Sequence, residues 1–253
     1  MNDQYWMIAA VVWALCVSGS GALSLFHPGR SRRLVWVLML VLMLIQSVAL
    51  MERSALGATC PIRGRSEVLF FLGWALNAFY LVLGRPYRMS VIGAFTAPLV
   101  AVLSLLAVLF YDPVVQSLVG QGWLTWHIGL AMLGYGALGL SALSAVVFLI
   151  QNSLMKAGRL TGLSRNLPPV RTLQSCMIRL IDAGFLLLML AQICGLQAWM
   201  AIPVAKCVVA AAVSVGYLLL ISVTYLRGLP GKVLAWWSIG LYVLSLSIFL
   251  VLQ

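Results

Sequence analysis

The side chain whose chemistry stands out is His127, in the string Trp123-Leu-Thr-Trp126-His127-Ile. A neutral imidazole is a common metal ligand and an axial ligand of haem iron. Two nearby tryptophans, Trp123 and Trp126, and Trp199 at the end of a later apolar run, could flank a planar ligand beside it. Two blander interpretations stay open: an interfacial histidine hydrogen-bonded to a loop, and the ordinary tryptophan belt of a membrane interface.

Small side chains follow His127 at helical spacing. They are Ala131, Gly134, Ser141 and Ala145. Such a strip can admit a flat ligand, and it can equally let another helix approach closely, which is the usual role of small residues in membrane helices. The sequence leaves both interpretations open.

Four charged residues near or within apolar runs are further candidates for structural or partner contacts. Arg179 and Asp182 are spaced i, i+3, so we expect a local ion pair close to the cytoplasmic end of their helix. Glu67 begins a helix, where a carboxylate suits the positive end of the helix dipole. Lys206 can extend its ammonium outward to the interface.

No string identifies the chain as an enzyme. The sequence contains no activated nucleophile, paired acid and base, Walker loop, dinucleotide fingerprint or zinc motif. Its five cysteines form no Cys-x-x-Cys, which excludes a thioredoxin-like redox motif and covalent haem attachment at Cys-x-x-Cys-His.

The elements that position these residues must be membrane helices. Hydrophobic residues make up 63% of the 253 residues, charged residues only 8%, and the mean hydropathy is +1.07. The apolar runs approach the roughly 20 residues that a helix needs to cross a bilayer, and they lack the alternation of a barrel strand. We therefore predict an all-α, polytopic transmembrane bundle forming a single domain over 1–253. Its eight helices are expected at 5–26, 34–51, 67–83, 89–111, 123–150, 177–199, 203–226 and 233–252.

Charge placement predicts how the bundle is oriented. The net charge is +11, and eleven of the sixteen Lys and Arg residues lie in alternate connectors between apolar runs. That distribution is typical of cytoplasmic loops, so both termini are expected on the non-cytoplasmic side, together with His127. It argues against nucleic-acid binding. The first apolar run follows Met-Asn-Asp-Gln with no basic n-region, and we expect it to be a retained helix.

Several strings, in order, resemble the integral-membrane cytochrome c assembly family, whose members include the CcsA, CcmC and HemX types. They are residues 60–75, which lead into Phe-Leu-Gly-Trp74; Gly84-Arg85-Pro-Tyr87-Arg88; Gly93-Ala-Phe-Thr-Ala-Pro98; Trp126-His127-Ile128 followed by Gly134-Tyr135; and residues 179–195. The resemblance covers most of the chain.

The resemblance implies haem handling at the outer face of a bacterial inner membrane and delivery to apocytochrome c, together with other assembly proteins. His127 matches one of the family's external histidine ligands, and Trp199 and Lys206 fall where its Trp-rich loop lies. That loop is cut short here, and Tyr225 stands near the position of a second histidine. This chain therefore supplies at most one external axial ligand, as in a short, HemX-like member.

Three functions are compatible with these observations. The first is a membrane component of cytochrome c biogenesis that assists haem handling. The second is a scaffold or regulator of the same pathway that keeps the fold without binding haem. The third, a transporter of a small solute, is disfavoured for ions because the helices contain few charged residues.

Overall fold

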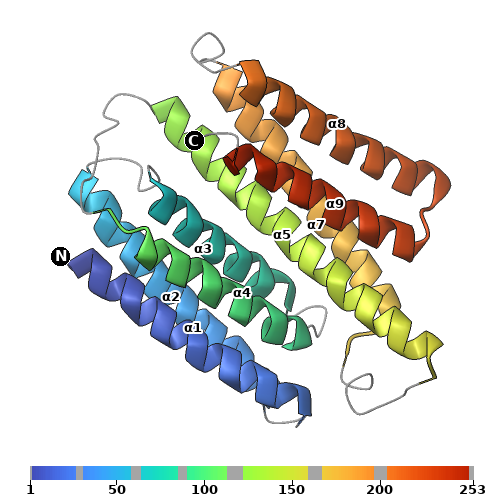
Figure 1. Ribbon diagram of the computed structural model, residues 1–253, viewed down its shortest axis with the longest axis horizontal. Helices are drawn as coiled ribbons and strands as arrows, with labels where there is room; N and C mark the ends of the chain where they lie inside the picture. The colour runs from blue at the N-terminus through green and yellow to red at the C-terminus, as the bar shows by residue number, and fades with distance from the viewer. Residues whose placement is uncertain are drawn as a thin grey trace.

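The computed structural model describes residues 2–26, 31–57, 64–84, 90–112, 122–158, 167–196 and 204–250. Within these residues the chain forms helices and no strand, which confirms the all-α prediction (Figure 1). The helices are α1 (Asn2–Phe26), α2 (Ser31–Gly57), α3 (Arg65–Gly84), α4 (Ser90–Leu109), α5 (Gly122–Lys156), α7 (Val170–Gly195), α8 (Val204–Arg227) and α9 (Gly231–Leu250).

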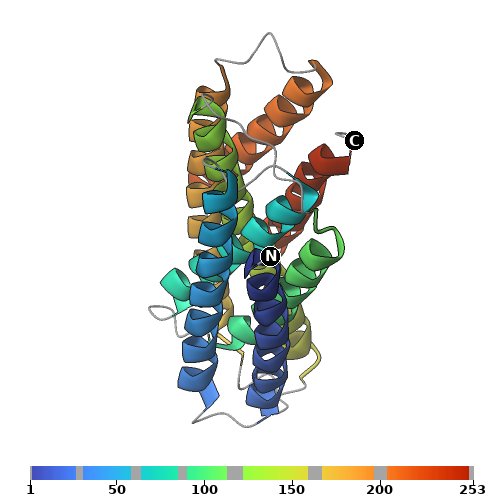
Figure 2. The same ribbon diagram turned by 90° about the vertical axis from the view of Figure 1, so that its left-hand side faces the viewer.

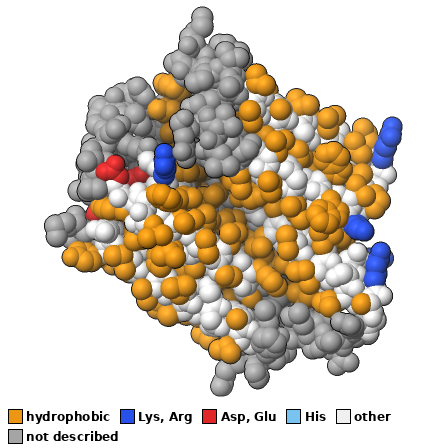
Figure 3. Space-filling model, viewed as in Figure 1, with side chains coloured by type: hydrophobic (Ala, Val, Ile, Leu, Met, Phe, Trp, Pro, Cys, Tyr) orange, Lys and Arg blue, Asp and Glu red, His pale blue; other side chains and the backbone are white. Residues whose placement is uncertain are grey.

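These helices have the length and the surface of membrane spans. Seven are long and apolar enough to cross a bilayer, and α9 is apolar over Gly231–Leu246. At 1.5 Å per residue, the 20 residues of α9 extend about 30 Å, close to the thickness of the hydrocarbon core. The outer surface is largely hydrophobic (Figure 3), as the lipid environment requires. The protein is an integral membrane protein.

The first four helices form one bundle. Helices α1 and α2 run side by side, and α4 packs against both α1 and α3 (Figure 2). The remaining helices are arranged around α5, which packs extensively against α7 and also against α9, while α8 lies at the edge of the bundle on α9 and α7.

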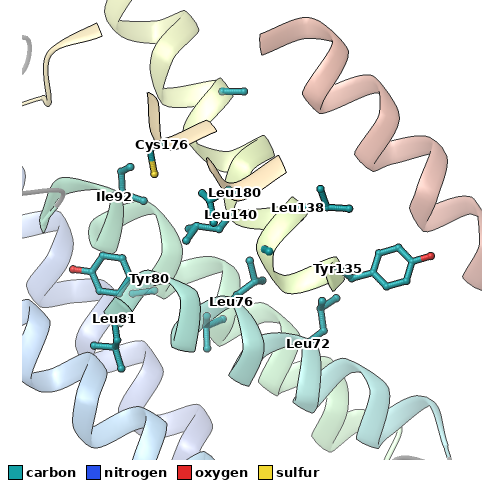
Figure 4. Packing of buried hydrophobic residues seen from close by; sticks show 14 of the residues in the cluster. Leu72, Leu76, Tyr80, Leu81, Ile92, Tyr135, Leu138, Leu140, Cys176 and Leu180 are labelled. Carbon is teal, nitrogen blue, oxygen red and sulfur yellow. The ribbon is translucent and has the colours of Figure 1, made fainter. Parts of the chain in front are cut away.

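Helix α3 joins the two halves through its contact with α5. In Figure 4, Leu76 of α3, Leu138 and Leu140 of α5 and Leu180 of α7 belong to the same cluster of buried side chains. All four side chains are buried.

Close packing of α5 and α7 depends on glycine. A Cβ on Gly184 would lie 2.6 Å from Cγ of Leu138 and 3.1 Å from the carbonyl oxygen of Gly134. The pair Gly134 and Gly184 therefore lets the two backbones approach, which is how small residues act in membrane helix pairs.

Helix α7 begins earlier than the sequence predicts. The expected start was residue 177, and the observed start is Val170, directly after Pro168 and Pro169. Hydropathy does not reveal the first two turns because they contain Arg171, Thr172, Gln174 and Ser175. Their apolar face is nevertheless buried through Leu173 and Cys176.

The charged side chains lie mostly at the two ends of the bundle. In Figure 3, acidic side chains gather at one end of the visible face beside a basic side chain, and further basic side chains lie at the opposite end. The start of α1 and the last turns of α9 lie toward the same end (Figure 1), as expected for eight crossings. That this end faces away from the cytoplasm remains a prediction from the charge distribution.

Candidate functional site

The imidazole of His127 lies where the beginning of α5 meets the end of α7. His127 is the sixth residue of α5 and is partly exposed. Its Nδ1 lies 2.7 Å from the carbonyl oxygen of Ala191 on α7. A carbonyl oxygen can only accept, so Nδ1–H is the donor of this hydrogen bond.

This bond sets the chemistry of the other ring nitrogen. In a neutral imidazole whose Nδ1 is protonated, Nε2 carries the lone pair. Histidines that bind metals through Nε2 commonly make the same Nδ1–H bond to a carbonyl or carboxylate, which fixes the ring and raises its basicity. Among the described residues, Nε2 has no protein hydrogen-bond partner.

Gly195 provides the space that the imidazole occupies. A Cβ at this position would lie 2.8 Å from Nδ1 and 3.0 Å from Cε1 of His127. Real side chains do not approach so closely, so any larger residue at position 195 would displace the ring. We call His127, Ala191 and Gly195 the His127 site.

A second polar contact holds the same end of α7. The side-chain amide of Gln192 donates to Oγ of Ser214 on α8 and, at 3.4 Å, to the carbonyl of Ala210. Gln192 follows Ala191 directly, so this link steadies the segment that orients His127. The sequence alone does not reveal Ala191, Gln192, Gly195 and Ser214, because no motif relates their positions to residue 127.

The strip of small residues below His127 is a helix-packing surface. Gly134 faces Gly184 and Leu188 of α7, and Oγ of Ser141 donates to the carbonyl of Met177 at 3.2 Å. The close approach of α7 therefore fills the side of α5 on which a flat ligand was considered. Of the two interpretations of this strip, the structure supports helix packing.

Of the predicted aromatic flank, the structure describes the side chains of Trp123 and Trp126, and the flank itself stays a prediction. Trp123, one turn before His127, is partly exposed, whereas Trp126 is 68% exposed on a different face of α5. Trp199 lies outside the described residues. Lys206 is the third residue of α8, and its side chain is likewise outside the description.

Arg179 and Asp182 lie farther along α7 than expected. Because α7 starts at Val170, they are its tenth and thirteenth residues instead of lying close to its beginning. Asp182 accepts a hydrogen bond from the hydroxyl of Tyr225 on α8 at 2.6 Å. Asp182 is nine residues, or about 13 Å, along α7 from Ala191, so this polar contact is separate from the His127 site. The Arg179–Asp182 pairing stays a prediction.

Glu67 has a larger role than a favourable position at a helix N-terminus. Its Oε1 accepts two hydrogen bonds from Arg53, at 2.9 Å from Nε and 2.6 Å from Nη2. Its Oε2 accepts from the backbone N–H of Gly64 at 2.8 Å. Both Arg53 and Glu67 are buried. The helix dipole alone is therefore an incomplete account of Glu67.

Arg53 also reaches the first and fourth helices. Its Nη1 donates to Oδ2 of Asp3 at 2.9 Å, and its Nη2 donates to the carbonyl of Asp112. The hydroxyl of Tyr111 donates to the same Asp3 oxygen at 2.8 Å, and the guanidinium lies 4.9 Å from the Tyr111 ring centre. We call Asp3, Arg53, Glu67, Tyr111 and the Asp112 carbonyl the Arg53 network.

Tyr111 lies two residues beyond the end of α4 at Leu109, outside the membrane-spanning segment. Burial, followed by the hydrogen bond to Asp3, raises the pKa of Tyr111 above its ordinary value. The phenol is therefore protonated at neutral pH, as it would be at its ordinary pKa, and it serves as a donor to Asp3.

The described residues contain no group of three or more His, Cys, Asp and Glu side chains that could hold a metal ion. Within this part of the chain, Cys16, Cys176, Cys194 and Cys207 are free thiols. The His127 site therefore offers a single nitrogen donor. That chemistry fits one axial bond to an iron already held by a macrocycle better than it fits a bare metal ion.

Comparison with known proteins agrees with this architecture. The family model described as cytochrome C assembly protein matches residues 64–253, about three quarters of the chain. The protein HemX of Brevibacillus brevis is 26% identical over 168 residues, which cover 65% of this chain and 61% of that protein.

Two proteins named cytochrome c biogenesis protein CcsA are also similar. The one from Trichodesmium erythraeum is 33% identical over 103 residues, covering 38% of this chain and 29% of that protein. The one from Nostoc punctiforme is 32% identical over 97 residues, covering 36% and 27%. The chain thus spans about three fifths of the HemX relative and under a third of each CcsA relative. On the match over residues 64–253, the chain belongs to the cytochrome c assembly protein family.

Proposed function

We propose that this protein is a membrane component of cytochrome c biogenesis that handles haem at the end of the bundle where α5 begins. The observation that supports this most directly is the 2.7 Å hydrogen bond from Nδ1–H of His127 to the Ala191 carbonyl. It leaves Nε2 as the nitrogen with a lone pair, in the arrangement of an axial histidine ligand. Membership of the cytochrome c assembly family supports the same function.

In this proposal, each residue of the His127 site has a different role in binding haem. His127 would donate Nε2 to the iron, the Ala191 carbonyl would hold the ring, and Gly195 would leave room for it. Trp123, one turn away on α5, would cover one edge of a planar ligand, and Trp199 from the α7–α8 connection and Lys206 at the start of α8 are proposed contributors. Haem, when bound, would supply the iron centre that is delivered to apocytochrome c.

Absorption spectroscopy of the purified protein tests the ligand. Titrating haem into wild type in detergent should produce a Soret band whose position and intensity change in His127→Ala. The matched control is His27→Ala, which removes the other histidine of the chain and should leave the spectrum unchanged. An identical Soret band in wild type and His127→Ala would remove His127 as a ligand.

A second function is favoured by a specific observation. The chain covers under a third of the CcsA relatives, and its described residues offer one imidazole and no metal-binding cluster. A scaffold or regulator in the haem and cytochrome assembly pathway would need only the helical bundle. Absence of haem binding, combined with specific co-purification of other cytochrome c assembly membrane proteins, would support the scaffold.

We further propose that the His127 end of α5 faces away from the cytoplasm in a bacterial inner membrane. In a variant lacking native cysteines, Thr125→Cys and Ser153→Cys mark opposite ends of α5. A membrane-impermeant maleimide should label Thr125→Cys in intact cells whose outer membrane is permeable to it, and Ser153→Cys only after lysis. The reverse pattern would contradict the proposed orientation.

A further inference from the structure

Three polar side chains meet inside the first four-helix bundle, away from the His127 site and the Arg53 network. Gln46 of α2, Asn77 of α3 and Ser104 of α4 are all fully buried, at 0% exposure. We call these residues and the adjacent Gly73 the Gln46 junction. Each lies well inside a membrane-spanning segment, where an unsatisfied polar group is costly.

The hydrogen bonds within the Gln46 junction are few and long. The amide nitrogen of Asn77 donates to the Met39 carbonyl at 3.1 Å and to Oε1 of Gln46 at 3.4 Å. The amide nitrogen of Gln46 donates to Oγ of Ser104 at 3.4 Å. Good hydrogen bonds of this kind are about 2.9 Å long. At 3.4 Å, the two hydrogen bonds between side chains are therefore weak and satisfy their donors and acceptors poorly.

Counting donors and acceptors shows which groups remain unmatched. Asn77 has used both N–H groups, but its Oδ1 has no partner among the described residues. Gln46 retains one N–H, and the Ser104 hydroxyl retains its own proton, since its printed contact is as an acceptor. One acceptor and two donors thus stay unmatched within the Gln46 junction.

Gly73 leaves space at this point. A Cβ built on Gly73 would contact Nε2 of Gln46 at 3.6 Å, Cβ of Leu103 at 3.6 Å and Oγ of Ser104 at 3.8 Å. These are ordinary van der Waals distances, so a methyl carbon at position 73 would lie directly against Gln46 and Ser104 without any shift. Asn77 follows Gly73 by one helical turn and faces the same side of α3.

From the unmatched groups and the adjacent space, we infer that the Gln46 junction binds an internal water molecule. The water donates to Oδ1 of Asn77 and accepts from the Gln46 amide or the Ser104 hydroxyl. Buried waters usually have two to four such partners, and the junction supplies three.

The bound water connects α2 to the helices that belong to the family region. Residues 64–253 match the family model, so α3 and α4 lie inside the matched region and α2 precedes it. The Arg53 network joins the same helices near their ends, and the hydrated junction joins them inside the bundle. The water thus extends the attachment of α2 along the helix.

Gly73→Ala tests the inference by the sign of its effect. The methyl group would take the place of the water and strand Oδ1 of Asn77, so we expect the apparent melting temperature in detergent to fall by about 2–6 °C. The matched control is Gly19→Ala on α1, where nothing lies within 4 Å and only helix propensity changes. If the Gly73→Ala variant melts at or above the melting temperature of the Gly19→Ala variant, the inference is overturned. In that case the methyl group would be filling dry space, which stabilises the protein.

Solid-state NMR in lipid bilayers reports the water itself. Magnetisation transfer from water should reach the side-chain amide protons of Asn77 and Gln46 in the wild type. That transfer should be lost in Gly73→Ala, while transfer to Gln192 persists. Absence of transfer to Asn77 in the wild type would also overturn the inference.

Discussion

Removing the guanidinium of Arg53 should destabilise the first four-helix bundle severely. The Arg53 side chain is 6% exposed and bonds to carboxylates from two other helices, Asp3 on α1 and Glu67 on α3. Arg53→Gln retains a polar side chain but neutralises the charge. Two buried carboxylates are then left without their cation, although the hydrogen bonds from Tyr111 to Asp3 and from Gly64 to Glu67 remain.

The size of the effect follows from burial. Breaking a buried ion pair by removing one partner costs about 3–5 kcal/mol, because the remaining charge is left uncompensated. For a protein of this size, that free energy corresponds to a fall in melting temperature of about 6–20 °C. An exposed cation gives the contrast, since its removal usually changes stability by less than about 0.5 kcal/mol. Arg33, exposed near the opposite end of α2, is such a residue.

Thermal unfolding in detergent, followed by tryptophan fluorescence, measures this difference. We expect Arg53→Gln to melt far below the wild type and Arg33→Gln to melt with it. A triple variant that adds Asp3→Asn and Glu67→Gln to Arg53→Gln should recover much of the loss, because no buried charge remains. If Arg53→Gln and Arg33→Gln melt alike, or the triple variant melts lower still, the assignment of an electrostatic cause is refuted.

Two further predictions concern α5–α7 packing and Tyr111. Gly184→Ala places a Cβ 2.6 Å from Leu138, so it should lower stability by about 1–3 kcal/mol, whereas Gly240→Ala, with nothing within 4 Å, should be neutral or slightly stabilising; equal melting temperatures would contradict the packing. The pKa of Tyr111 is raised on folding, so its contribution is complete below pH about 10 and is lost as the pH rises through its folded pKa. Tyr111→Phe should therefore lose less stability than wild type above pH about 10, and identical alkaline profiles would refute this.

The helices could be predicted because the bilayer imposes a simple rule. Each apolar run long enough to cross must be helical, and all eight expected segments overlap an observed helix. The predicted helix boundaries were wrong where polar residues continue a helix beyond its most apolar part. The first two turns of α7 and the extension of α2 to Gly57 are both of this kind.

The Arg53 network could not be predicted from the number and placement of charged residues in the sequence. Arg53 lies beyond residue 51, the expected end of its helix, and a cation in a connector indicates only topology. Its partners come from 50 residues earlier and 14 residues later in the chain. A signal existed, since the chain has only five acidic residues and a buried carboxylate requires a cation. Pairing them required the contact of α1, α2 and α3.

His127 could be singled out from the sequence, but its orientation could not. Residue type and the family resemblance pointed to position 127. The Ala191 carbonyl and the space at Gly195 depend on how α7 crosses α5, and that crossing is determined by Gly134 and Gly184. Small residues alone indicate that helices approach, without telling which helix does so.

The most direct test of the account is chemical rescue of the proposed ligand. His127→Gly should shift the spectrum of the haem-loaded protein, and added imidazole should restore the wild-type spectrum by occupying the cavity and supplying its nitrogen. A wild-type spectrum in His127→Gly without imidazole would contradict ligation by His127.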